Sequence, residues 1–159
     1  MRAIIQRVKS ASVTVNCKVI SQIERGILVF VGISRNDSEK DVEYIIRKLL
    51  NIRIFPEENS DKRWHLSVKD LNLEILCVSQ FTLYSVLKGN KLDFHNAMSP
   101  SESKVFYENF IEKLKRSYKS DLVKDGEFGA LMEVSLVNDG PVTINLDSRA
   151  DSNNQAGDE

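Results

Sequence analysis

The sequence predicts a single α/β domain in which a strongly curved, largely antiparallel and partly barrel-like β structure is flanked by two main helices. The length of 159 residues suits one hydrophobic core. Alternating or β-branched apolar segments recur along the chain and are typical of strands. Only two segments carry apolar residues at helical spacing over several turns. The order of the strands does not follow from this periodicity.

The first third of the chain predicts three strands and a helix. Residues 2–8 and 12–17 are strand-like, the latter because Val13 and Val15 alternate with polar residues. The continuous β-branched run from Ile27 to Ile33 is typical of a central strand. Asp37 or Ser38 then caps a helix. Its buried face is formed by apolar residues at helical spacing, namely Val42, Ile45, Ile46 and Leu49.

The second helix has a strong start signal, Ser99-Pro100-Ser101-Glu102, with a capping serine, a proline at the first helical position and a glutamate at the third. Its buried stripe comprises Phe106 or Tyr107, Phe110, Leu114 and Tyr118. Before it, a strand over residues 74–80 leads into a long connection, Ser85 to Met98, and connections of that length are often functional.

The chain is expected to end in a hairpin and a tail. Two alternating strands, Met132 to Leu136 and Val142 to Leu146, flank the corner Asp139-Gly140-Pro141. The domain therefore covers residues 1–147. Residues 148–159 contain no large apolar side chain and are expected to form a disordered polar tail.

Composition excludes several classes of protein. A net charge of −1 argues against a protein that coats duplex nucleic acid, because such a protein needs an extended basic surface. The longest apolar runs, such as residues 27–31, are too short to span a membrane, and no signal segment follows Arg2. Cys17 and Cys77 match no zinc spacing and indicate reduced thiols. These features favour a cytoplasmic protein with no membrane partner.

One candidate site follows the apolar run Ile75 to Val78, where the chain changes to Ser79-Gln80-Phe81-Thr82. The successive N–H groups of Phe81 and Thr82 can converge on a developing oxyanion. Ser79 and Gln80 would orient the reacting group, and Thr82 would be a nucleophile or a hydrogen-bonding partner. The alternative is a strand end whose polar side chains only satisfy neighbouring loops.

The sequence lacks the usual catalytic motifs. It contains no glycine-rich phosphate loop, no dinucleotide fingerprint and no Gly-x-Ser-x-Gly elbow. His65 and His95 stand in no metal-binding spacing, so neither a metal nor a cofactor is expected. Catalysis would then depend on amides, hydroxyls and the substrate itself. Two lysines of the connection next to the polar motif, Lys88 and Lys91, are candidates for contacts with the phosphates of a nucleic acid.

The chain contains two linked motifs, Ser79-Gln80-Phe81-Thr82-Leu83 and Asn138-x-Gly140-Pro141-Val142-Thr143. Together they resemble the motif pair of the D-aminoacyl-tRNA deacylases, also called D-tyrosyl-tRNA deacylases. The likeness includes Met1 to Val15, Lys88-Gly89-Asn90-Lys91, Asp93-Phe94-His95 and Lys124-Asp125-Gly126 with Phe128-Gly129, and it extends to about Leu146. The family usually has a proline where this chain has Leu92 and an apolar residue where it has Asn96.

The resemblance implies a deacylase-like fold and a hydrolase for chiral proofreading in translation. Such enzymes cleave the ester of a D-amino acid, or of glycine, on the acceptor end of tRNA and release the free amino acid. They are homodimers, and a cis Gly-Pro pair, here Gly140-Pro141, enters the pocket of the other subunit and rejects L-amino acids. By the same resemblance, Phe128 and Met132 flank the adenine, with Ala97 nearby. The alternative is that these residues only pack in the core.

Two mechanisms and two other functions stay open. Water assisted by the 2′-hydroxyl of the substrate, with the Phe81 and Thr82 amides holding the oxyanion, fits the lack of a histidine base. The competing mechanism makes Thr82 a covalent nucleophile. The alternative functions are a non-catalytic nucleic-acid-binding or replication-associated protein on the same fold, and an esterase that acts on small D-amino acid esters without tRNA.

Overall fold

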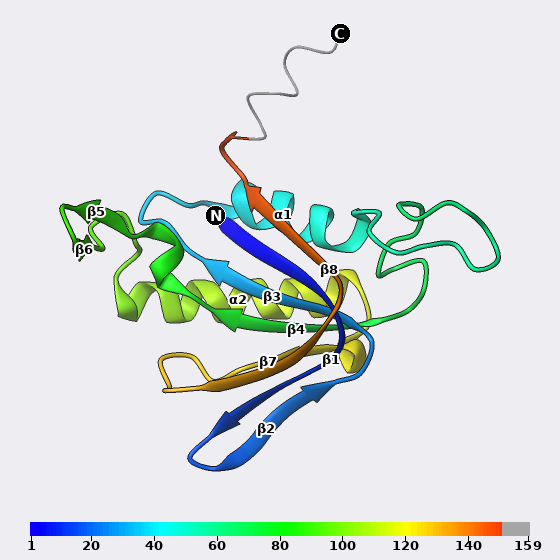
Figure 1. Cartoon of the computed structure of the whole chain (residues 1–159). Coiled ribbons are helices and arrows are strands. Elements are labelled where there is room, and N and C mark those ends of the chain that lie inside the picture. Colours follow the sequence, from blue (N-terminus) through cyan, green and yellow to red (C-terminus); the bar gives the residue numbers. More distant parts are fainter. Residues whose placement is uncertain (151–159) are drawn as a thin grey trace, which may run out of the picture.

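The computed structural model describes residues 1–150. Its helices and strands follow in the order β1 (Arg2–Val15), β2 (Lys18–Ile23), β3 (Gly26–Gly32), α1 (Glu39–Asn51), β4 (Glu74–Ser79), η1 (Phe81–Tyr84), β5 (Val86–Lys88), β6 (Lys91–Asp93), α2 (Pro100–Ser117), η2 (Ser120–Leu122), β7 (Val123–Asp125) and β8 (Glu133–Asp147). Figure 1 shows both α-helices beside a curved sheet, with the β5–β6 hairpin projecting from one end.

The main sheet has the order β2-β1-β3-β4-β7, and β8 also pairs with β1. The pairings of β1 with β2, β3 and β8 are antiparallel, whereas β3–β4 and β4–β7 are parallel. The parallel β3–β4 pair needs a crossover, which α1 supplies. A largely antiparallel, partly barrel-like sheet with two main helices confirms the predicted fold class.

The curved sheet buries both of its faces. Along β3 and β4, Ile27, Val29 and Ile75 belong to a large apolar cluster that includes the buried sides of α1 and α2. The alternate residues Leu28, Leu76 and Val78 belong to a second cluster, inside the curve formed with β1 and β2. Because successive side chains of a strand point to opposite faces, this double burial requires the continuous apolar runs seen in the sequence.

Both predicted helix starts are confirmed. Ser38 caps α1, and its backbone N–H donates to the Asp41 carboxylate at 2.8 Å. Pro100 is the first residue of α2, after Ser99. The strands predicted at residues 2–8 and 12–17 are a single strand, β1, because pairing with β8 continues across the residues between them.

The predicted terminal hairpin is wrong. β8 is one strand that runs antiparallel to β1 on both sides of the Gly-Pro corner, from Glu133 opposite Thr14 to Asp147 opposite Arg2. At the corner, residues 139–142 stand opposite Arg7 alone, since Gln6 pairs with Thr143 and Val8 with Asn138. The corner is therefore a bulge that projects from a continuing strand and does not reverse the chain.

Two further segments differ from simple loops. The connection from Ser85 to Met98 contains the β5–β6 hairpin. Of the predicted tail, residues 151–159 lie outside the described residues, while Ser148 is buried and its hydroxyl donates to Asp41 at 2.6 Å. No helix among residues 1–150 has both the length and the apolar content needed to cross a membrane.

Candidate active site

A pocket of about 650 Å³ lies where the parallel strands β3 and β4 end. The carboxyl ends of parallel strands are the usual place for ligand sites in α/β sheets. The short helix η1 packs closely over Gly32, the last residue of β3. A Cβ at Gly32 would lie 2.8 Å from Cβ of Leu83 and 3.1 Å from the Gln80 carbonyl oxygen, so the approach of η1 requires a glycine.

The predicted motif forms one edge of this pocket. Ser79 ends β4 and, with Gln80 and Phe81, lines the pocket. The Gln80 N–H donates to the Val31 carbonyl at 2.8 Å, which fixes the turn into η1. The Gln80 side chain donates through Nε2 to Oγ1 of Thr82 at 2.5 Å. The Thr82 hydroxyl is thus engaged within the motif, and Thr82 is not one of the residues that line the pocket.

The first two backbone N–H groups of η1 are available to bind a ligand. Neither the Phe81 N–H nor the Thr82 N–H donates to an acceptor among residues 1–150. This follows from their position, because the first N–H groups of a helix have no partner inside the helix. Adjacent unpaired N–H groups at the edge of a pocket are the donors that an oxyanion requires.

No ionisable side chain lines the pocket within the described part of the chain. Asp125, at the end of β7, has a pKa raised by burial, but it is not a lining residue. Among residues 1–150, no three His, Cys, Asp or Glu side chains lie close enough to hold a metal ion. The walls therefore offer hydroxyls, amides and apolar surface.

The residues assigned to adenosine by resemblance, Ala97, Phe128 and Met132, all line this pocket. Phe128 is half-buried, and its ring lies 5.8 Å from that of Tyr107 in α2. Ala97 lies far from Phe128 and Met132 in the sequence, and the structure brings these two segments together at one pocket. An aromatic ring and a thioether suit the face of a purine.

Several lining residues were missed by sequence reasoning. Phe94 packs edge-on against Phe81, with ring centroids 5.0 Å apart, although Phe81 is 57% exposed. Ser103 brings a buried hydroxyl from α2, and Leu131 is 96% exposed at the rim. The motif Asp93-Phe94-His95 was the available signal for Phe94, whereas nothing in the sequence marks Ser103 or Leu131.

The Gly140-Pro141 pair does not line this pocket. The peptide bond between them is cis, both residues are exposed, and Gly140 has φ of +124°. Arg7 holds the base of the bulge. Its Nε donates to the Asp139 carbonyl at 3.0 Å and lies 3.4 Å from the Asp139 carboxylate, and its Nη1 donates to the Ile54 carbonyl.

Lys88 and Lys91 stand on opposite strands of the β5–β6 hairpin, outside the pocket. Lys88 donates to Asp93 at 2.5 Å, whereas no carboxylate among the described residues contacts Lys91. The hydrogen bond from Lys88, together with those from His95, holds the pKa of Asp93 well below its usual range. Of the two phosphate candidates, Lys91 is the one whose charge is not already balanced.

Comparisons with known proteins agree on one family. The family described as D-Tyr-tRNA(Tyr) deacylase matches residues 4–147. A D-aminoacyl-tRNA deacylase of Dictyostelium discoideum is 56% identical over 149 residues, which cover 94% of this chain and 99% of the relative. The human D-aminoacyl-tRNA deacylase 1 is 55% identical over 150 residues, covering 94% of this chain and 71% of the relative.

Two solved structures share the fold of this chain. A structure described as c-Myc DNA unwinding element binding protein has a TM-score of 0.89 and 54% identity, and the match covers 92% of this chain and 98% of the other. A probable eukaryotic D-amino acid tRNA deacylase has a TM-score of 0.78 at 19% identity, covering 91% and 97%, which shows a shared fold.

Proposed function

Because this chain belongs to the D-Tyr-tRNA(Tyr) deacylase family, we propose that it hydrolyses the ester bond of D-aminoacyl-tRNA, and of mischarged glycyl-tRNA, and spares the L-aminoacyl esters. The observation that carries the proposal is the pair of adjacent unpaired amides at the start of η1, Phe81 and Thr82, of which Phe81 lines a pocket with no ionisable side chain among the described residues. Such a pocket can stabilise a developing oxyanion but supplies no base of its own.

The proposed chemistry uses water and the substrate's own ribose. A water oxygen bonds to the ester carbonyl carbon, and the carbonyl oxygen takes up negative charge beside the Phe81 and Thr82 amides. The neighbouring 2′-hydroxyl relays the water's proton to the departing 3′ oxygen as the ester bond breaks. The products are a free amino acid and tRNA with a free 3′-hydroxyl. Ala97, Phe128 and Met132 hold the terminal adenosine.

The Thr82 hydroxyl has a different role in this scheme. It accepts a hydrogen bond from Gln80, and no residue among 1–150 that lines the pocket is a base that would activate it as a nucleophile. Thr82 therefore acts through its backbone N–H, while its side chain orients Gln80.

The selection of D-esters is proposed to require a homodimer. In one protomer, Gly140-Pro141 is exposed and lies outside the pocket, so the pair can reach a pocket only in a second copy. Val137, on the same strand, is 53% exposed, and Leu131, beside the pocket, is 96% exposed. One of these exposed apolar residues lies near the corner, and the other lies at the pocket that the corner of a second copy would enter, so both support such an interface. Rejection of L side chains by the inserted carbonyls would be steric.

The substrate implies the partner and the compartment. The proposed partner is the acceptor end of aminoacyl-tRNA in the cytoplasm, with Lys91 near its phosphates. A second candidate function is non-catalytic nucleic-acid binding. It is favoured by one solved structure, 54% identical to this chain, that is described as a DNA unwinding element binding protein. Its weakness is the net charge of −1, which provides no extended basic surface.

The test is deacylation of matched D-, L- and glycyl-tRNAs by the purified protein without added metal. Loss of the D and glycyl esters with the L ester intact would support the proposed editing activity. A folded dimer that hydrolyses none of them would favour the binding function. Equal rates on small D-amino acid esters without tRNA would indicate a general esterase.

A further inference from the structure

A second pocket, of about 800 Å³, lies on the other side of the segment that borders the candidate active site. Consecutive residues belong to different pockets: Asn96 lines the second pocket and Ala97 the first. Within η1, Phe81 lines the first pocket and Tyr84, three residues later, lines the second. Consecutive Cα atoms are about 3.8 Å apart, so the wall between the pockets is a single segment thick.

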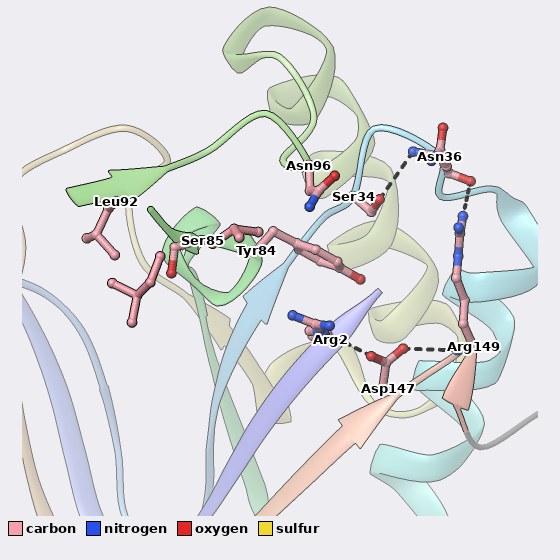
Figure 2. Close-up of a pocket in the computed structure, with 11 residues that line it drawn as sticks. Arg2, Ser34, Asn36, Tyr84, Ser85, Leu92, Asn96, Asp147 and Arg149 are labelled. Atoms are coloured by element: carbon pink, nitrogen blue, oxygen red, sulfur yellow. Dashed lines mark hydrogen bonds and ion pairs between the residues drawn. The ribbon is translucent and has the colours of Figure 1, made fainter. Parts of the chain in front are cut away.

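One wall of the second pocket is a continuous polar chain, as Figure 2 shows. Arg2 Nε donates to the Asp147 carboxylate at 2.9 Å, and that carboxylate also accepts from the Arg149 N–H at 3.1 Å. The Arg149 guanidinium donates in turn to the Asn36 carbonyl, and the Asn36 N–H donates to the Ser34 hydroxyl.

This wall carries net positive charge. The side chains of Arg2 and Arg149 are 42% and 50% exposed, and Asp147 is the only carboxylate among residues 1–150 that lines the pocket. The carboxylate of Asp37, which is fully buried and does not line the pocket, lies 2.7 Å from the Met1 amino group and 3.8 Å from the Arg149 guanidinium, so it is shared between two cations and balances Arg149 only in part. Arg2 also donates to the Leu83 carbonyl, which ties this wall to η1. Arginine side chains in such a setting suit a phosphate group.

The opposite wall is apolar. It comes from the β5–β6 hairpin, where Val86, Leu87 and Leu92 line the pocket and are 39%, 68% and 53% exposed. Three exposed apolar side chains beside a cationic wall offer a flat ring one surface and a phosphate another. The volume lies within the range of small-molecule sites.

Tyr84 supplies the observation that points to a ligand. The residue is 9% exposed, and its hydroxyl has no hydrogen-bond partner among the described residues. In Figure 2 its ring reaches from the hairpin side toward the wall of Arg2 and Asp147. Burial raises the pKa of Tyr84, so the hydroxyl stays protonated and can donate. A buried donor without an acceptor is unfavourable, and a ligand that supplies the acceptor removes this cost.

We propose that the second pocket binds the cytidine nucleotide that precedes the terminal adenosine of the tRNA acceptor end. This rests on the proposed function, which places that adenosine in the neighbouring pocket. All tRNAs end in C-C-A, so the nucleotide beyond the segment is a cytidine. Its base lies against the hairpin leucines, with a ring acceptor toward Tyr84 or Asn96, and the phosphate that joins the cytidine to the adenosine lies at Arg2 and Arg149.

The test compares two esters of one D-amino acid, on adenosine and on the dinucleotide cytidylyl-adenosine. The KM should be lower for the dinucleotide ester, by about three- to tenfold for each good hydrogen bond gained. Tyr84→Phe, which removes only the orphan hydroxyl, should raise the KM for the dinucleotide ester toward that for the adenosine ester. Arg149→Gln should do the same.

Tyr107→Phe is the matched control. Its hydroxyl is also buried without a partner among the described residues, but Tyr107 does not line the second pocket. This variant should keep the wild-type preference for the dinucleotide ester. Thermal unfolding of each variant shows whether it is folded.

Three outcomes overturn the subsite. They are equal KM values for the two esters in the wild type, a Tyr84→Phe variant with the wild-type preference, and free cytidine monophosphate binding without any advantage of the dinucleotide. Hydrolysis of neither ester counts against the proposed function instead. Calorimetry with unacylated cytidylyl-adenosine and adenosine then decides the subsite, because only tighter binding of the dinucleotide, lost in Tyr84→Phe, supports it.

Discussion

The two motifs that mark this chain differ in how they are held. Ser79-Gln80-Phe81-Thr82 continues directly from β4, whose residues 75–78 are buried, and the turn after it is fixed by a backbone hydrogen bond to β3. The Gly140-Pro141 pair projects from β8 into solvent, and Arg7 contacts only its base.

This difference suggests a division of labour. The motif anchored in the core presents its donors in a fixed geometry, as stabilisation of a transition state requires. The exposed corner has no pocket of its own to act on within one protomer. We therefore expect substitutions at the first motif to reduce the rate for every substrate, and substitutions at the second to change which substrates are accepted.

The largest expected effect comes from removing one amide at the first motif. Phe81→Pro eliminates the N–H at the first position of η1, where proline is readily accommodated. The preceding residue, Gln80, has φ of −146° and ψ of 83°, outside the helical region that proline would forbid. We expect kcat to fall by about 10²–10³-fold on D-aminoacyl-tRNA, the usual loss for one oxyanion donor.

Phe81→Ala is the matched control, because it also removes the ring that packs on Phe94 but keeps the N–H. Its kcat should stay well above that of the proline variant. Equal rates for the two variants would show that the ring, and not the amide, is what the reaction needs.

At the second motif, Gly140→Ala should reduce selectivity. Gly140 has φ of +124°, and an added Cβ would lie 3.0 Å from Cγ2 of Val142 and 3.2 Å from Nη2 of Arg7. Side-chain-bearing residues at such φ cost about 1–3 kcal/mol, so the corner has to shift. We expect the ratio of D- to L-ester hydrolysis rates to fall by about tenfold, since 1.4 kcal/mol is a factor of ten.

Gly89→Ala provides the comparison. Gly89 also has positive φ, +63°, but nothing lies within 4 Å of an added Cβ, and it belongs to the turn of the β5–β6 hairpin. Its ratio of D to L rates should equal that of the wild type. If Gly140→Ala also preserved that ratio in a folded dimer, the steric model of rejection would be wrong.

A smaller effect is expected from Thr82→Ala. The change keeps the backbone N–H and removes the acceptor of one hydrogen bond from Gln80. A neutral hydrogen bond is worth about 1 kcal/mol, so kcat should fall by less than about tenfold. Single-turnover rates on D-aminoacyl-tRNA would measure it. Complete loss of activity in the folded variant would instead identify the hydroxyl as a nucleophile.

Local signals in the sequence were sufficient for much of the fold. The start of α2 follows from Ser99-Pro100, and the double burial of β3 follows from its continuous β-branched run, because both depend on neighbouring residues. The position of Ser79 at the end of a buried strand follows for the same reason. These features need no knowledge of distant contacts.

The remaining features could not be predicted because they depend on contacts between residues far apart in the sequence. The Asp139-Gly140-Pro141 corner is typical of a turn, and only the pairing of β8 with β1 on both sides shows that it is a bulge. The second pocket depends on contacts between residues far apart in sequence, such as Arg2 with Asp147. Leu92 and Asn96 stood out in the sequence as departures from the family, but their common place at that pocket required the structure.

The smallest expected effect concerns the charges of the β5–β6 hairpin, which lines the second pocket and belongs to neither motif. Lys91→Gln removes a cation that no carboxylate among the described residues balances. The slope of log affinity for tRNA against log salt should therefore become shallower by about 0.7, the value for one contact with single-stranded phosphate. Filter binding at several salt concentrations measures this slope.

The double variant Lys88→Gln with Asp93→Asn is the informative control, because it removes both members of an ion pair and leaves the local charge unchanged. The pKa of Asp93 lies well below its usual range, so its carboxylate is ionised, and the pair stays intact, throughout the neutral range of the assay. The double variant should keep the wild-type salt slope. A slope reduced as much as in Lys91→Gln would mean that Lys88 leaves Asp93 to contact the phosphate, and the hairpin would then contribute two contacts.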